Sequence, residues 1–182
     1  MPVTVLPESF TMVDFDAAEI RAVAERVAAD VGLADHDITV TVDERTPLSR
    51  TRVRSLDPIA VAVDGGAFED LRRLRQQSEE RIEAALGLHL RQTADRLDPA
   101  FGAPDLDDEI ELPHQTAWDV YALGRLARIG HRSQRGRRLY HFRNRHGFTD
   151  AADAAFERLW TADGLTWAAI VALSDSLQPA AV

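Results

Sequence analysis

The chain contains no cysteine and no lysine, and these two absences exclude whole classes of chemistry. Without cysteine there are no disulfides, thiol nucleophiles, thiolate metal sites or iron–sulfur ligands. All 21 cationic side chains are arginine, so Schiff-base chemistry, a lysine general base and a phosphate-loop lysine are excluded as well. Because lysine codons are AT-rich, this usage indicates a bacterial genome of high GC content rather than selection at a site.

Long apolar runs are also lacking, and we expect no leader. No stretch approaches the roughly 20 apolar residues that span a bilayer. The opening "MPVTVLPESFTM" has neither the basic nor the apolar region of a secretion signal. We therefore expect a cytoplasmic protein without membrane contact. A net charge of −9 and a pI near 5.1 argue against nucleic acid as a partner of the whole molecule.

Alternating apolar residues predict a small sheet in the first third of the chain. Strands are expected near 2–6, 37–44 and 59–63, and the last two should pair with each other. The segment between them, 45–58, fits either a polar edge strand or an exposed loop. Asp16 and Gly32 mark the start and end of a first helix, which carries an apolar stripe.

Helical spacing dominates the rest of the chain. We expect a long helix over 67–97, a central core helix over about 114–129 and a short helix over 137–147. A break covers 131–136, and two more helices follow Thr149 or Asp150, the last of them strongly apolar. The prediction is an α+β fold in which the small sheet packs on a helix-rich C-terminal two-thirds.

At 182 residues, of which 45% are hydrophobic, the chain has the size of one domain and can bury roughly 70% of its unfolded surface. We expect a single domain over 1–182, with an α+β portion at 1–66 and a helical portion at 67–182. An acidic, proline-bounded connection covers 98–113.

The segment "HRSQRGRRLYHFRNRHGF" at 131–148 holds six arginines and three histidines in an acidic chain. One interpretation is internal neutralisation, with partners elsewhere in the fold, including the acid run at 105–111. The other is an anion site that grips phosphate. A mixture, with some arginines paired and two or three left open, is also physically reasonable.

The anion interpretation names specific residues. In a helix over 137–146, Arg138, His141 and Arg145 share one face at spacings of three and four. Arginine forks suit bidentate phosphate contacts, and a histidine adds a donor or an acid–base group. The full candidate set for a ligand is Arg137, Arg138, Tyr140, His141, Arg145 and His146.

Other patterns are weak. The "VDGG" turn at 63–66 has the geometry of a phosphate cradle, but Glu69 and Asp70 follow it and repel anions. The acid run lacks the glycine and glutamate of a calcium loop. No HExxH pair or serine elbow occurs, so we expect no metal and no cofactor, although a site built on His114 with His141 or His146 stays open.

These patterns give no trusted catalytic motif and leave open whether the chain is an enzyme. The expectation is a non-catalytic protein that acts through self-association or partner binding, because the long 67–97 helix and the apolar terminal helix need something to cover them. The alternative is a protein or enzyme that binds an anionic or phosphorylated ligand through the 131–148 cluster.

Overall fold

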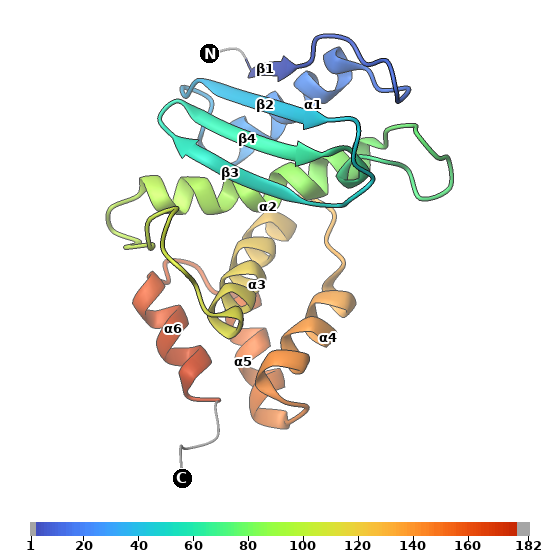
Figure 1. The fold of residues 1–182 in the computed structure, drawn as a ribbon. Coiled ribbons are helices and arrows are strands. Elements are labelled where there is room, and N and C mark those ends of the chain that lie inside the picture. The colour runs from blue at the N-terminus through green and yellow to red at the C-terminus, as the bar shows by residue number, and fades with distance from the viewer. Residues whose placement is uncertain (1–2, 178–182) are drawn as a thin grey trace. The chain divides into compact units, whose positions relative to one another are not determined.

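The structure, a computed structural model, describes residues 3–177. The chain divides into two compact units, one ending at Leu97 and one beginning at Asp98 (Figure 1). The predicted α+β class is confirmed, with four strands near the N-terminus and six helices in the described residues. The helical segment just before residue 97 groups with the sheet rather than with the later helices. That residues 1–182 form one domain stays a prediction.

The first unit is built on a mixed sheet. Its strands are β1 (Val3–Leu6), β2 (Ile38–Asp43), β3 (Thr51–Leu56) and β4 (Ile59–Asp64), in the order β1-β2-β4-β3. The predicted pairing of β2 with β4 is confirmed, and it is parallel, with Val40 opposite Val61. β3 runs antiparallel to β4 at the edge, which answers the question left open for 45–58 in favour of an edge strand.

Only one face of this sheet is deeply buried. Alternate valines and isoleucines of β1, β2 and β4 point to that face, where α1 (Ala17–Asp30) and α2 (Glu79–Leu97) pack. The small residues between them, such as Thr39 and Ala60, face the other side and are only half-buried. The predicted cap of α1 is confirmed, since the Asp16 carboxylate accepts a hydrogen bond from the Ala18 amide at 2.8 Å.

The predicted helix over 67–97 is wrong in its first part. A short 3-10 turn, η1 (Gly65–Ala67), follows β4, and α2 begins only at Glu79. Between them the chain folds into a loop, in which the Asp70 amide donates to the Gln76 carbonyl and the Ser78 amide to the Phe68 carbonyl. Asp70 also accepts from the Arg72 amide, a local bond that competes with a helix. Leu71 and Leu74 keep their helical spacing but lie in this loop.

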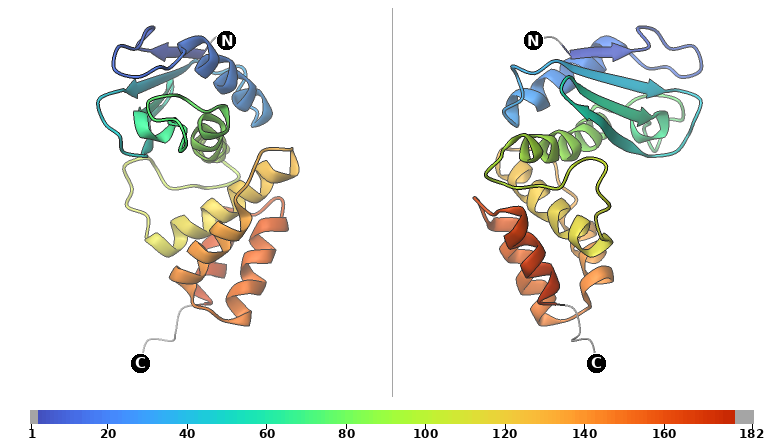
Figure 2. Two further views of the ribbon diagram at one scale, coloured as in Figure 1. Left: turned by 90° about the vertical axis from the view of Figure 1, so that its right-hand side faces the viewer. Right: turned by 60° about the vertical axis from the view of Figure 1, so that its left-hand side comes forward.

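The second unit is a group of four helices around α3. They are α3 (Leu112–Arg128), α4 (Arg135–His146), α5 (Asp150–Thr161) and α6 (Trp167–Asp175), and each of the other three packs against α3 (Figure 2). Trp118 and Tyr121 of α3 are fully buried, and Phe101 stacks on both rings. The prediction of a central core helix near 114–129 is confirmed. α4 begins inside the segment predicted as a break.

One glycine allows α3 and α5 to meet closely. A Cβ atom at Gly124 would lie 2.2 Å from the Trp160 carbonyl oxygen, well inside van der Waals contact. The same oxygen accepts a hydrogen bond from Arg128 at 2.6 Å. The backbone of α5 therefore rests directly on α3 at this point, and a side chain here would force the helices apart.

We expect Gly124→Ala to lower the free energy of unfolding by about 1–3 kcal/mol, because the added methyl group meets backbone. Gly136→Ala is the matched control, since a Cβ atom in α4 at that position meets nothing within 4 Å. The control should raise stability by about 0.5 kcal/mol, through better helix propensity and a less flexible unfolded chain. Urea titrations of both variants measure the difference, and equal effects would contradict the close contact.

Candidate functional site

α4 carries most of the arginine-rich segment and sorts its side chains onto two sides. Phe142 and His146 point into the second unit and are buried. Tyr140 and Phe148 lie on the other side, with 58% and 63% of their surface exposed. Whether an arginine of α4 is paired or open therefore depends on the side of the helix on which it lies.

Two arginines on the flank of α4 are neutralised by α5. Arg143 forms a two-pronged ion pair with Asp153, with distances of 2.7 and 2.5 Å to the two carboxylate oxygens. This pair lowers the pKa of Asp153 and raises that of Arg143. Arg135 pairs with Glu157 one turn further along α5, and its guanidinium lies over the Phe156 ring. These partners come from α5, not from the acid run at 105–111.

Arg138 holds an intermediate position. Its side chain is half-buried, and this burial lowers the pKa of the guanidinium, while the negative charge of Asp119 on α3 partly opposes the shift. An arginine placed so deeply contributes its stem to packing as well as its charge. Arg138 therefore borders the outer side of α4 rather than standing open upon it.

The remaining candidates lie together on the solvent side, which we call the outer face of α4. Its members recur at helical spacings of three and four and are all exposed: Arg137, Tyr140, His141, Asn144, Arg145 and, just beyond the helix, Phe148. The Tyr140 and Phe148 rings meet edge to face at 5.9 Å. Arg137 contacts only the Gln134 and His141 side chains, and in the described part of the chain no carboxylate pairs with Arg137 or Arg145.

Asn144 and Phe148 were not among the residues predicted from the sequence. The signal was present, since both continue the three- and four-residue spacing from Tyr140 and His141. The predicted end of the helix at Gly147 is confirmed, with φ +96° at that residue. Phe148 follows directly, and its ring contacts Tyr140 on the same face.

His146 serves a different purpose from the outer face. Its ring stacks on Phe142 at 4.0 Å, its Nδ1 lies 3.1 Å from the Phe142 carbonyl oxygen, and its Nε2 lies 2.8 Å from the Ser174 hydroxyl. Ser174 is fully buried. The next residue of α6, Asp175, contacts His114 of α3 at 2.6 Å. Two histidines from two helices thus fasten the end of α6.

These contacts bear on the open possibility of a histidine metal site. His141 lies on the outer face, away from the buried His146. Both ring nitrogens of His146 have protein partners. Among residues 3–177 no group of three or more histidine, aspartate and glutamate side chains is arranged to hold a metal ion.

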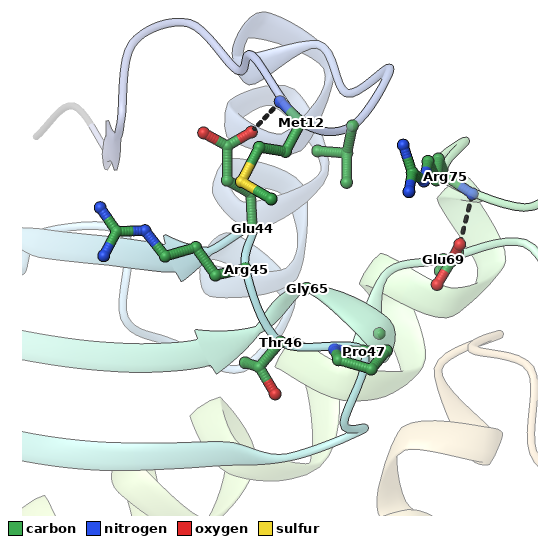
Figure 3. Close-up of a pocket in the computed structure, with 10 residues that line it drawn as sticks. Met12, Glu44, Arg45, Thr46, Pro47, Gly65, Glu69 and Arg75 are labelled. Carbon is green, nitrogen blue, oxygen red and sulfur yellow. Dashed lines mark hydrogen bonds between the residues drawn. The ribbon is translucent and has the colours of Figure 1, made fainter.

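A cavity lies in the first unit, beyond the carboxyl ends of β2 and β4. Its volume is about 210 Å³, and Figure 3 shows its lining. The lining residues are Met12, Val13, Glu44, Arg45, Thr46, Pro47, Gly65, Gly66, Glu69 and Arg75. Open sheets often bind ligands at this edge.

The two carboxylates of this cavity, Glu44 and Glu69, bond to the backbone of its walls. Glu44 accepts hydrogen bonds from the Thr11 and Met12 amides at 2.9 and 2.7 Å, and these bonds lower its pKa. Glu69 accepts from the Arg75 amide, and Arg45 extends away from the cavity (Figure 3). The aliphatic parts of Met12, Val13 and Pro47 are left to form its apolar wall.

The glycine turn of "VDGG" has a structural explanation. A Cβ atom at Gly66 would lie 1.9 Å from the Pro47 carbonyl oxygen, so only glycine lets the two segments pass. In the described residues no helix is long and apolar enough to cross a membrane. Comparisons with models of protein families, with curated proteins and with solved structures found no match.

The buried His146 predicts a pH dependence of stability. Burial lowers its pKa below the ordinary value of 6.5, and the nearby His114 adds to this, although the Phe142 carbonyl partly offsets it. The unfolded chain then binds more protons, so stability is complete above pH 6.5 and falls as the pH drops toward the folded pKa. We expect the free energy of unfolding to decline in this window.

The double variant His146→Phe with Ser174→Ala removes the buried pair without leaving either partner unsatisfied, and it should flatten this decline. His141→Ala is the control, because His141 is exposed and its removal should leave the slope unchanged. Urea titrations at a series of pH values measure the effect. A decline of the same steepness in the double variant would contradict the assignment to His146.

Proposed function

We propose that the chain is a binding protein that holds an extended anionic ligand against the outer face of α4. One observation carries the proposal. Within residues 3–177, Arg137 and Arg145 have no carboxylate partner and lie beside two exposed rings, while Arg135 and Arg143 of the same helix pair with acids of α5. Pairing within the fold explains Arg135 and Arg143, but it does not explain Arg137 and Arg145.

The spacing of these groups favours a ligand with repeated charges. Arg137 and Arg145 are eight residues apart, about 12 Å along the helix, and Tyr140 lies between them. A ligand that follows the face would meet a cation, an aromatic ring and a second cation in turn. Single-stranded nucleic acid has this character, since its phosphates pair with arginine and its bases stack on aromatic rings.

The acidity of the whole chain sets limits on such binding. A net charge of −9 repels a polyanion at long range, but the Debye length at physiological salt is only about 8 Å. Contacts at the outer face therefore act locally. The proposal is a weak, salt-dependent interaction with a short strand and not general adhesion to nucleic acid.

The test is a fluorescence anisotropy titration with an oligothymidylate of roughly 12 nucleotides. With two phosphate contacts, log K should fall with log salt at a slope of about −1.4, since each contact in a single strand contributes about −0.7. Arg137→Ala and Arg145→Ala should each weaken binding and make the slope shallower by about 0.7. Tyr140→Ala should weaken binding by about 1–3 kcal/mol without changing the slope.

Arg158→Ala is the matched control, because this exposed arginine of α5 makes the same change of charge away from the outer face. It should leave the slope unchanged. Equal losses in Arg158→Ala and Arg145→Ala would mean that only net charge matters, and the proposal would fail. Polyglutamate of matched charge that binds as tightly as the oligonucleotide would point to an acidic protein partner instead.

Self-association stays a prediction, and one of the two observations that suggested it, the long helix over 67–97, does not hold. The 67–97 segment is not a single long helix, so no surplus helical length calls for a partner. The apolar α6 still exposes alanines such as Ala168 and Ala172 to solvent.

A further inference from the structure

The exposed apolar residues of the first unit gather at one edge. Leu71 and Leu74 expose 82% and 83% of their surface, and Met12 and Leu48 about half of theirs. All four lie in loops that follow β1, β2 or β4 in the chain, and the 68–78 loop projects beyond the sheet (Figure 1). We call the set formed by residues 8–14, 44–50 and 65–77 the carboxyl edge of the sheet.

The leucines are exposed on an ordered support. The Asp14 amide donates to the Arg75 carbonyl at 2.7 Å, which ties the loop to the chain ahead of α1. The Gln77 side chain accepts from the Asp16 amide at 2.9 Å and donates to Glu19 at 2.6 Å. Arg75 adopts φ +62°, an unusual value for a residue other than glycine, and its amide is held by Glu69. The loop thus presents Leu71 and Leu74 at a fixed place.

The loop that bears Leu71 and Leu74 lies next to the cavity on this edge. Leu74 precedes Arg75, which lines the cavity whose apolar wall is formed by Met12, Val13 and Pro47. At about 210 Å³ the cavity is smaller than the roughly 300–1,000 Å³ of sites that enclose a drug-sized molecule, and it suits an inserted side chain better. In a two-fold dimer, a surface with a projecting loop beside a cavity is complementary to itself, because the loop of each copy faces the cavity of the other.

The carboxyl edge differs from the rest of the chain in its net charge, which is zero. Its five arginines and five acidic residues cancel, although the chain as a whole carries −9. Two copies of an acidic chain repel each other least through a neutral surface. The mixed charges also favour a second copy over an anionic membrane or a strongly charged ligand, neither of which a neutral edge attracts.

We infer that the carboxyl edge is the contact between two copies of this chain, in which the Leu71 and Leu74 tip of each copy enters the cavity of the other. The dimer is two-fold and closed, because the same edge serves both copies. This contact is independent of the outer face of α4, which lies in the second unit.

Sedimentation equilibrium of the full chain tests the inference. The wild type should form a reversible dimer of twice 20.2 kDa. Added salt should tighten the dimer, since it screens the repulsion between the two acidic copies. The double variant Leu71→Ser with Leu74→Ser should raise the dissociation constant at least about tenfold, because four exposed leucines lose their cover in each dimer.

Two controls distinguish the edge from other apolar surfaces. Leu112→Ser with Ile129→Ser replaces two apolar residues of the second unit that are also more than half exposed, and it should leave the dissociation constant unchanged. Ala172→Arg places a charge on the exposed side of α6 and should also have no effect. Thermal melting at concentrations below the dissociation constant of the wild type, where every variant is a monomer, should give equal melting temperatures, since none of the replaced side chains is buried.

A mixing experiment tests the two-fold arrangement. Wild type mixed with the leucine variant should form a dimer of intermediate strength, since one of its two tip-and-cavity contacts remains. Growth beyond a dimer would overturn the closed arrangement. A wild type that stays monomeric at high concentration, or a dimer broken by Ala172→Arg and not by the leucine changes, would overturn the inference. Leucine-dependent binding of a monomer to phosphatidylcholine vesicles would do the same.

Discussion

The packing of α4 against the second unit, through buried Phe142 and His146 and the Arg143–Asp153 pair with α5, determines which arginines of the segment face water. A lysine-free chain places all its side-chain positive charge on arginines, whose planar forks pair with carboxylates in a fixed geometry. The burial of Phe142 and His146 fixes the rotation of α4 about its own axis and turns the Tyr140 side of the helix toward water. Asp153 and Glu157 of α5 then pair with Arg143 and Arg135 on one flank of α4 and reinforce this rotation. Arg137 and Arg145 stay on the exposed side.

Sequence periodicity predicted secondary structure most reliably where one face of the element is buried. The alternation of Ile38, Val40 and Val42 predicted β2 because a strand with one buried face leaves that pattern. The same kind of reasoning failed at Leu71 and Leu74, whose spacing imitates a helix although neither is buried. Spacing alone carries no information on burial. Here the Asp70 turn, which depends on contacts with Gln76 and the chain before α1, determined the outcome.

The candidate site was predictable in composition but not in orientation. The sequence identifies the segment, and a mixture of paired and open arginines is one of the outcomes that it predicts. Which arginine faces water depends on α5, however, and no spacing within α4 contains that information. Arg137 and Arg138 are neighbours in the sequence, yet Arg137 is exposed and Arg138 is half-buried. His146 likewise required its partner Ser174, which lies 28 residues later in the chain.

The Gln77 side chain links the mobility of two segments. It bonds both to the Asp16 amide and to Glu19, so the loop that bears the exposed leucines and the first turn of α1 share one support. Opening of either segment breaks the two Gln77 bonds that they share, which couples the segments in local unfolding. Hydrogen exchange at the start of α1 is therefore a remote reporter of order at the tip of a loop some 60 residues later in the chain.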